Sequence, residues 1–504
     1  MKSPYPIIII FSLWLISFLG KQAYITSSVD YSDNASIQVL TTLKCWDEKS
    51  PVNYAFLPVQ TFQNNGDKFI TPYKRIEDSV GNNYYVSYPP FVFQLAYFFE
   101  KLTGLGSNKL MLMLLNSLLQ LVSALYLFKI LLMRLKDDSY GMYLSLLWVS
   151  IFLLAPVSNY SFSRMYFSET LAIPLWLVSS YYFLKLLIST HESKNRFFIR
   201  NEVKFGIALF LFVYTEWLGI IFAAILILML LFNKEWVSRK KIIFLILISS
   251  ITPLILFFIQ LLYISSIHQM IQGLGIRFVE RSGWFGHKYS GEGVAINNGI
   301  VFQYLVNNGI QALSLIGALL FLIIPAFYFR FYKKVKSIDR QLMMLFVLPV
   351  IIHVLIFMNA NALHLYLFEK SLISIIILLM IGSKLLKLYT VKWSSIIAGV
   401  VTCALSINLF FMDITPENSE KEELFMNKIA DQIKSEATSD CAIFANIQNS
   451  KAPTQDLIYL GFILSRNIGF ANSPTEAREK QIQKKSILFI DADYITKNVT
   501  AIKY

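Results

Sequence analysis

The chain has 504 residues, of which 55% are hydrophobic and only 15% are charged, and its mean hydropathy is +0.53. Ordinary soluble domains carry about 25% charged residues, so this composition excludes that class and indicates a membrane protein. The net charge of +13 does not indicate a nucleic-acid partner, because Lys and Arg lie between hydrophobic runs and not along one stripe. Their placement is typical of the positive-inside rule of membrane topology.

Hydrophobic runs of about 18 residues recur throughout the chain, as expected for transmembrane helices. We predict about eleven of them, at residues 5–25, 108–132, 140–156, 171–188, two within 205–232, then 242–265, 310–329, 341–358, 365–383 and 393–411. With the N-terminus in the cytoplasm, this arrangement places most Lys and Arg residues in the inner loops.

The run 205–232 is long enough for one tilted helix, but both of its flanks are basic. Lys204 precedes it and Arg239 follows it, and both are cytoplasmic only if the chain crosses twice. Glu216 lies near the middle of the run, where a buried carboxylate would cost several kcal/mol at the bilayer centre. We therefore predict two short helices, with Thr215–Trp217 at an outer turn between them.

Two long outer segments and a polar tail complete the predicted organisation. The transmembrane domain covers 1–411 and includes outer loops at 21–107 and 266–309, while 412–504 forms a small α/β module outside the membrane. In the module, the pattern of apolar residues predicts helices at 417–435 and 456–465 and strands at 441–447 and 486–490. The predicted fold class is thus an all-α polytopic membrane protein with a small α/β C-terminal module.

The first outer loop contains the most informative residues. Two acids, Asp30 and Asp33, follow the first helix closely, and Tyr88-Pro89-Pro90-Phe91 ends the loop. In this order and spacing, about the first 220 residues resemble the GT-C class of glycosyltransferases, such as protein O-mannosyltransferases and lipid A aminoarabinose transferases. Several members carry adjacent acids directly at the membrane exit, whereas the two acids here are separated and lie slightly further out.

The resemblance implies a multi-span enzyme of a bacterial plasma (inner) membrane. Such an enzyme uses a polyprenyl-phosphate-linked sugar as donor and transfers a hexose or pentose to a lipid, glycan or protein acceptor on the outer face, with inversion. Its expected partners are these substrates and membrane lipids, and no nucleic acid. Some members use a divalent metal, but no spacing of His, Asp and Glu in this chain predicts a metal site.

An acid in the first loop has a clear chemical use. An acceptor hydroxyl is a poor nucleophile near neutral pH, and a carboxylate can take its proton as it attacks the anomeric carbon. Asp30 and Asp33 are both candidates for this base. The alternatives are that Asp33 caps a helix starting near Ala35 and that Asp30 is simply solvated.

The phosphate that leaves needs cations and hydrogen-bond donors. In the second loop we assign this role to Arg277, Arg281, His287 and Lys288, although the two arginines could instead hold phospholipid headgroups. The remaining substrate-binding candidates lie near the outer ends of helices: Tyr88, Arg164, Glu169, Glu216, His364 and Lys370. Glu169 could also cap a helix, Glu216 could pair with an arginine, and His353 is interpreted as a packing or hydrogen-bonding residue inside a helix.

Two other functions fit a chain with many membrane helices. A polysaccharide polymerase or ligase would not need an acidic loop directly after the first helix. A lipid-linked sugar flippase or transporter would show internal repeats and charges along a central pathway. The charges here gather at one face of the membrane, which favours a glycosyltransferase.

Overall fold

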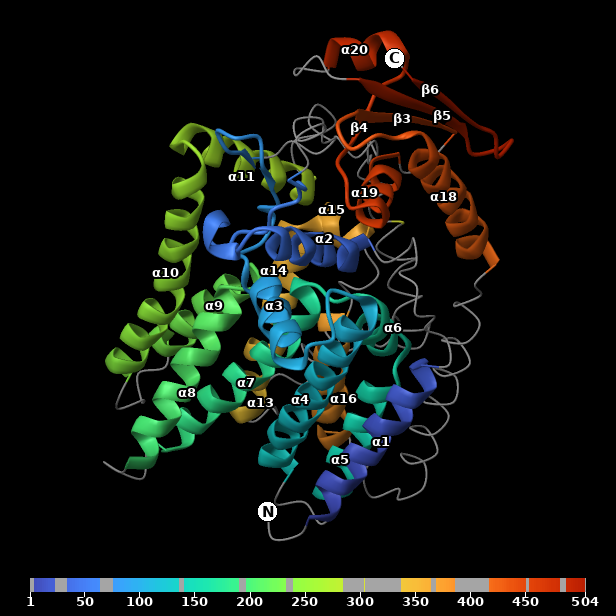
Figure 1. Ribbon diagram of the computed structural model, residues 1–504. Helices are drawn as coiled ribbons and strands as arrows, with labels where there is room; N and C mark the ends of the chain where they lie inside the picture. Colours follow the sequence, from blue (N-terminus) through green and yellow to red (C-terminus); the bar gives the residue numbers. More distant parts are fainter. Residues whose placement is uncertain are drawn as a thin grey trace. The chain divides into compact units, whose positions relative to one another are not determined.

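The structure is a computed structural model (Figure 1). It describes residues 4–22, 34–63, 76–135, 140–189, 196–232, 239–283, 303, 337–363, 369–385, 417–449, 453–480 and 486–503. The chain divides into two compact units. The first contains Met1–Ile25, Met113–Leu256 and Gly275–Ile414, and the second contains Thr26–Leu112, Phe257–Leu274 and Thr415–Tyr504.

The described part of the first unit is helical. Its helices are α1 (Tyr5–Gln22), most of α4 (Lys109–Leu135), α5 (Gly141–Leu154), α6 (Pro156–Arg164), α7 (Ser168–Ser189), α8 (Arg196–Val213), α9 (Leu218–Phe232), the first part of α10 (Arg239–Ile264), the end of α11 (Ile267–Ser282), α13 (Ser337–Phe346), α14 (Leu348–Ile356), α15 (Met358–Leu363) and α16 (Glu369–Leu385). One apolar core joins most of them, because α7 packs along α8, α1 along α5, and α13 and α14 against α9.

Four helical stretches among the described residues are long and apolar enough to cross a membrane: Lys109–Leu135, Ser168–Leu187, Arg239–Ile264 and Ser337–Ile356. A fifth results if α5 and α6, which meet at 56°, count as one broken span. Tyr5–Leu19 and Leu218–Phe232 are shorter apolar helices. The predicted spans at 310–329 and 393–411 lie outside the described residues, so the total of about eleven stays a prediction. The chain is a multi-pass membrane protein.

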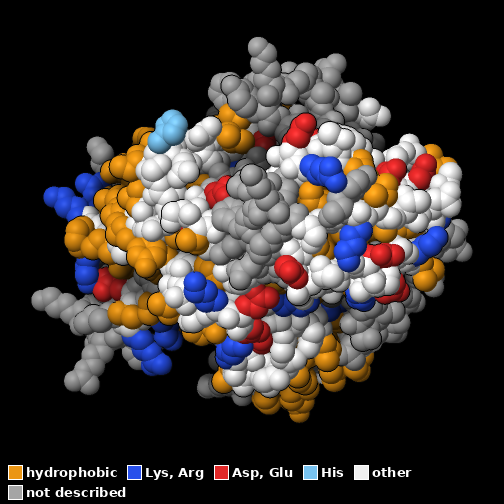
Figure 2. Space-filling view, turned by 45° about the horizontal axis from the view of Figure 1, so that its top comes forward, with side chains coloured by type: hydrophobic (Ala, Val, Ile, Leu, Met, Phe, Trp, Pro, Cys, Tyr) orange, Lys and Arg blue, Asp and Glu red, His pale blue; other side chains and the backbone are white. Residues whose placement is uncertain are grey.

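Among the four long apolar helices, α10 exposes the largest share of its apolar surface. Only 33% of its apolar stretch is buried in the protein, against 72% for α7. Figure 2 shows a band of hydrophobic side chains on the left, the side where α10 lies in Figure 1. A long helix with this much exposed apolar surface is stable only in a lipid environment.

Two predicted boundaries are wrong. The predicted outer loop after the third span contains helix α6, because Pro156 forces the preceding residue out of the helical region (Ala155, ψ 142°) and then starts a new helix. Helix α8 begins at Arg196 and not at 205, so Lys204 lies inside a helix and not in a loop. Charged and polar residues extend this helix beyond its apolar stretch.

The predicted break near Glu216 is confirmed. Helix α8 ends at Val213 and α9 begins at Leu218, with a turn between them. The turn is so tight that a Cβ on Gly219 would lie 2.8 Å from the Cα of Val213, which explains the glycine. The placement of this turn on the outer face stays a prediction.

A buried ion pair ties together two helices near their ends. The guanidinium of Arg134, in the last turn of α4, contacts both carboxylate oxygens of Asp339, in the first turn of α13. Both side chains are less than 10% exposed. Such a pair is geometrically specific, and removing one partner leaves a buried charge behind.

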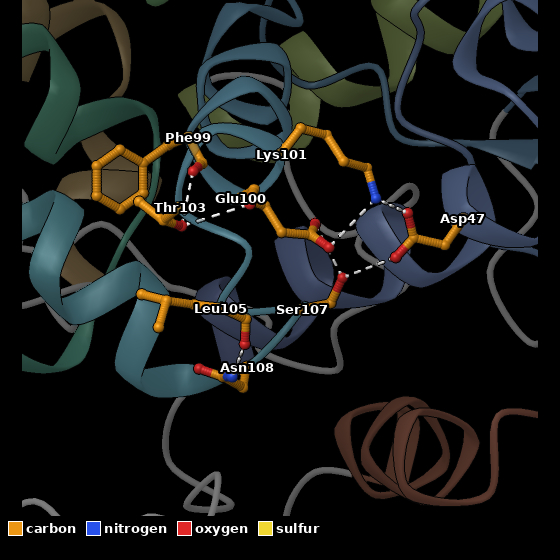
Figure 3. A network of polar contacts seen from close by, with 8 residues as sticks. All are labelled: Asp47, Phe99, Glu100, Lys101, Thr103, Leu105, Ser107 and Asn108. Carbon is orange, nitrogen blue, oxygen red and sulfur yellow. Dashed lines mark hydrogen bonds and ion pairs between the residues drawn. The ribbon is translucent and has the colours of Figure 1, made fainter.

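In the second unit, the first loop forms α2 (Asn34–Glu48), the short 3₁₀ helix η1 (Pro51–Tyr54), the hairpin β1 (Ile76–Glu77) and β2 (Asn83–Tyr84), and α3 (Phe91–Thr103). Figure 3 shows the polar network at the end of α3. Lys101 pairs with Asp47 of α2 at 2.5 Å, and Ser107 donates to Glu100 at 3.0 Å. Burial and the nearby charge of Asp47 raise the pKa of Glu100 above its usual value.

The C-terminal part of this unit is a small mixed sheet with three helices. Strands β3 (Ala442–Gln448), β4 (Ile468–Phe470), β5 (Ile487–Asp493) and β6 (Val499–Lys503) lie in the order β4-β3-β5-β6. Strand β3 is parallel to β4 and β5, and β6 is antiparallel to β5. Helices α18 (Glu417–Glu436) and α19 (Pro453–Leu464) cover one face and α20 (Pro474–Lys480) the other (Figure 1).

This sheet confirms the predicted small α/β module, and it is joined to the first loop within the second unit. The amide of Asn467 hydrogen-bonds both backbone groups of Phe62, at 2.9 and 3.0 Å. Lys44 of α2 donates to the carbonyl of Phe462 at 2.9 Å. The tail therefore supports the loop that follows the first helix. The predicted division of the chain at residue 411 stays a prediction.

Candidate functional site

The centre of the candidate site is Glu216, at the turn between α8 and α9. One carboxylate oxygen accepts the backbone N–H of Leu218 at 2.7 Å, which satisfies a donor in the first turn of α9. The other lies 2.8 Å from Nε2 of His353, in α14. Glu216 and His353 are 0% and 2% exposed, so this polar contact is made away from water.

Lys370, in the first turn of α16, approaches the same histidine. Its ammonium lies 3.1 Å from Nδ1 of His353, and the amide of Asn361 lies 3.4 Å from the same atom. Because a carboxylate requires a donor and an ammonium requires an acceptor, we assign the proton of the neutral imidazole to Nε2. His353 then bridges a buried cation and a buried anion.

Local contacts hold Lys370 in this position. Ser374, one turn further along α16, donates to the carbonyls of Lys370 and of Phe346 in α13, at 3.2 and 2.5 Å. Lys370 is 3% exposed, and it interacts electrostatically with four charged side chains, Glu216, Glu169, Arg281 and Glu369. We call these five charged residues and His353 the mixed-charge cluster: Glu169, Glu216, Arg281, His353, Glu369 and Lys370.

A small cavity lies within the mixed-charge cluster. Among its lining residues are Glu169, Glu216, Glu369 and Lys370, the last two from α16 and Glu169 from the first turn of α7. It offers about 10 Å³ to the centre of a water molecule, which is close to the space one water needs. Ligand pockets begin at roughly 300 Å³, so no sugar fits inside it. The cluster can hold charges in place, and its interior has room for about one water molecule.

Two arginines of the predicted second outer loop lie in α11, and one of them acts on the cluster. Arg277 is 9% exposed and donates to Glu280 at 2.7 Å, so its charge already has a carboxylate partner. The end of α11 is fixed against α15, because Asn359 donates to the carbonyl of Glu280 at 2.5 Å and packs against Gly283. Arg281, in this last turn, interacts electrostatically with both Lys370 and His353.

The structure thus brings together four of the predicted site residues, Glu169, Glu216, Lys370 and Arg281. Tyr88 is a buried residue of the second unit, 1% exposed. The remaining candidates lie outside the described residues or, for Arg164, have a side chain outside them: Asp30, Asp33, Arg164, His287, Lys288 and His364. In the described ranges, no three His, Cys, Asp or Glu side chains could together hold a metal ion.

Two residues of the cluster were not predicted. His353 was interpreted as a packing or hydrogen-bonding histidine, and Glu369 was not considered. The available signal was an ionisable residue inside an apolar run, the same signal that singled out Glu216. Which partner each one meets was not readable, since Glu216 and His353 are 137 positions apart.

The sequence matches no protein-family model and no curated protein. Solved structures do match. The aminoarabinose transferase ArnT from Cupriavidus metallidurans, bound to undecaprenyl phosphate, aligns over 98% of this chain and 94% of its own, with a TM-score of 0.56 and 12% identity. The archaeal oligosaccharyltransferase AglB from Archaeoglobus fulgidus, in complex with an inhibitory peptide and a dolichol-phosphate, aligns over 95% of this chain and 69% of its own, with a TM-score of 0.56 and 10% identity.

The chain has the GT-C glycosyltransferase fold. At 10–12% identity the matches establish the fold alone. They confirm the predicted resemblance and extend it from about the first 220 residues to nearly the whole chain. In this GT-C chain the mixed-charge cluster joins the N-terminal ends of α7 and α16 to the turn that precedes α9.

Proposed function

We propose that this chain is a membrane glycosyltransferase that moves a hexose or pentose from a polyprenyl-phosphate-linked donor to a lipid, glycan or protein acceptor outside the plasma membrane. The observation that supports this most is the alignment over 98% of the chain with ArnT, a structure that holds undecaprenyl phosphate. The AglB structure contains a dolichol-phosphate, which is also a polyprenyl-type phosphate.

In the proposed reaction, Asp30 or Asp33 takes the proton of the acceptor hydroxyl as its oxygen attacks the anomeric carbon. The bond between that carbon and the phosphate oxygen breaks, and polyprenyl phosphate leaves with the electron pair. Attack from the opposite side inverts the anomeric configuration. The order of the two acids and the Tyr-Pro-Pro-Phe run supports this assignment, as it does in the resemblance to the class.

The leaving phosphate would be met by Lys370 and Arg281. His353 contacts the ammonium of Lys370 and is itself held by Glu216, so this ammonium has a fixed place before the donor arrives. A charge that is already in place is effective at stabilising the negative charge that develops on the leaving phosphate. Because the cavity beside it is too small for a sugar, the donor would contact the cluster at the Lys370 edge. Arg277 is already paired with Glu280, which makes it a weaker candidate.

Four other predicted ligands complete the proposal, although their side chains lie outside the described residues. Arg164, His287, Lys288 and His364 would contact the donor phosphate or sugar. Glu169, which lines the small cavity, would face the reacting groups.

The test is mass spectrometry of lipids and glycans from cells that lack the gene, complemented with wild type, Asp33→Asn, Asp30→Asn or the control Asp440→Asn. Asp440 is an exposed acid of the second unit, so the control makes the same chemical change at a residue with no proposed role. We expect one sugar to disappear from an envelope glycan and its polyprenyl-phosphate donor to accumulate. Wild type and the control should reverse both changes, whereas the variant of whichever acid is the base, Asp30→Asn or Asp33→Asn, should reverse neither.

Other outcomes would contradict the proposal in distinct ways. Accumulation of whole repeat units on the lipid carrier would establish a polymerase or ligase. Full complementation by both Asp variants would exclude the proposed base. Unchanged glycans would favour a flippase or transporter.

A further inference from the structure

At the other end of α7 from Glu169, three lysines from three helices meet three tyrosines. Lys129 belongs to α4, Lys185 to α7 and Lys204 to α8. Tyr126 comes from α4, and Tyr181 and Tyr182 come from α7. We call these six residues the lysine–tyrosine cluster, and it takes no part in the proposed reaction.

The rings of the cluster form one packed group. The ring centroid of Tyr126 lies 5.4 Å from that of Tyr181 and 6.1 Å from that of Tyr182. The hydroxyl oxygens of Tyr126 and Tyr182 are 3.3 Å apart. The lysines surround this group. Lys129 lies 4.3 Å over the ring of Tyr126, and Lys185 lies 5.0 Å over that of Tyr181.

Lys204 closes the group from α8. It lies 5.3 Å over the ring of Tyr182, and its charge acts on the hydroxyl of that residue. All three lysines are half-buried. Within the ranges that the structure describes, no carboxylate pairs with any of them, although both Lys185 and Lys204 act electrostatically on Lys129. Aromatic rings attract cations but carry no net charge, so no described residue compensates the three positive charges.

The position of the cluster limits what can compensate it. Lys185 follows Glu169 by 16 residues, which is about 24 Å along a helix at 1.5 Å per residue. That distance places the cluster near the opposite boundary of a roughly 30 Å hydrocarbon layer. On α8, Val203 and Ile207 flank Lys204 and are 54% and 57% exposed, so apolar surface continues beside the charges.

We propose that the lysine–tyrosine cluster binds the phosphate headgroup of an anionic phospholipid from the leaflet on that side. The three ammonium groups and two tyrosine hydroxyls would contact the phosphate oxygens, and the exposed residues of α8 would contact the acyl chains. Basic pockets between membrane helices bind anionic headgroups in this way. Single lysines and tyrosines are common at membrane boundaries, but there each reaches the headgroup region separately. Convergence from three helices onto one set of rings indicates a site.

The test is thermal unfolding of the full chain, delipidated in a neutral detergent, during titration with short-chain phosphatidylglycerol. We expect phosphatidylglycerol to raise Tm in a saturable manner and phosphatidylcholine to leave it unchanged. The triple variant Lys129→Gln, Lys185→Gln, Lys204→Gln should need at least tenfold more phosphatidylglycerol for half of the effect. Tyr126→Phe with Tyr182→Phe, which keeps the rings, should need severalfold more.

The matched control is Arg239→Gln with Lys240→Gln, because these residues lie in the first turn of α10 and Lys240 is exposed. It should respond as wild type does. Should the triple variant fold poorly, native mass spectrometry of wild type provides the second measurement, and retained phosphatidylglycerol is expected there. An equal response to phosphatidylcholine, or an equal loss in the control, would overturn the proposal. An equal effect of inorganic phosphate would also overturn it, by assigning the site to a free anion.

Discussion

The clusters of charged residues at the two ends of α7 differ in sign: one combines charges of both signs, and the other has lysines only in the described ranges. Around Glu169, carboxylates, a lysine, an arginine and a histidine are gathered in one buried cluster, and each charge has an opposite charge nearby. Around Lys185, three lysines gather and no carboxylate in the described ranges pairs with them. In the mixed-charge cluster the protein itself supplies charges of both signs before any ligand arrives, whereas the described residues of the lysine–tyrosine cluster supply charges of one sign, which an anion from outside can compensate. The first arrangement suits the preorganisation of a reaction, and the second suits the capture of a lipid.

The largest effect should follow from removing the carboxylate of Glu216 from the mixed-charge cluster. Glu216→Gln leaves the ammonium of Lys370 buried with less negative charge and weakens the orientation of His353. We expect the transfer rate to fall at least 100-fold, together with a loss of stability of about 3–5 kcal/mol, as when one partner of a buried pair is removed. Release of polyprenyl phosphate and thermal unfolding measure the two effects.

A double-mutant cycle separates a coupled cluster from a mere sum of contacts. Lys370→Met in the Glu216→Gln background removes the buried charge that the first change left with less negative charge around it. The double variant should therefore be more stable than the sum of the two single effects predicts, with a coupling of about 2 kcal/mol. Strictly additive losses would show that Glu216 acts only as a cap for α9.

The second largest effect concerns a balanced pair at the same end as the lysine–tyrosine cluster. Arg134 follows Lys129 by five residues in α4, yet it has a buried partner in Asp339. Asp339→Asn should lower the unfolding free energy by about 3–5 kcal/mol. Lys241→Gln, which breaks a pair whose lysine is 60% exposed, should cost less than about 1 kcal/mol. Equal losses in thermal unfolding would remove the distinction between buried and exposed pairs.

The third effect should have the opposite sign. In neutral detergent without anionic lipid, Lys129→Gln removes one of three charges that repel one another and have no carboxylate partner in the described ranges. We expect Tm to rise on the order of 1 °C, while Lys240→Gln leaves it unchanged. A fall in Tm for Lys129→Gln would mean that the cation–π contacts outweigh the repulsion, and the contrast between the two ends of α7 would be lost.

These contrasts also explain what the sequence could predict. The turn at Glu216 was predictable because one carboxylate in an apolar run has few acceptable positions, and the rule acts locally. Strands β3 and β5 of the tail were predictable from their apolar pattern, and the fold class from the loop motif and hydropathy. Strands β4 and β6 were not predicted. Lys204 was misplaced in a loop because charge was read as a loop signal, although the helix extends over it.

The composition of either cluster could not be predicted, since it depends on contacts between distant helices. His353 meets Glu216 across 137 positions, and nothing near either residue in the sequence encodes that contact. The lysine–tyrosine cluster likewise needs α4, α7 and α8 side by side. Local sequence patterns set the ends of the helices, whereas only packing decides which charged residues compensate one another.

The smallest effect on stability is expected outside the membrane spans, at Glu100, a buried carboxylate whose charge is only partly compensated by Lys101. Burial and the charge of Asp47 raise the pKa of this carboxyl, so its ionised form destabilises the folded state. The penalty is fully present above the raised pKa and disappears as pH falls below the usual value near 4.5. Glu100→Gln keeps an acceptor for Ser107 and removes the charge (Figure 3), so Tm should rise on the order of 1 °C at pH 7.5 and not at pH 4. The exposed Asp440→Asn should show no such gain. A gain at pH 4 as large as at pH 7.5 would exclude ionisation as its cause, and the partial balance that Lys101 provides would then be sufficient.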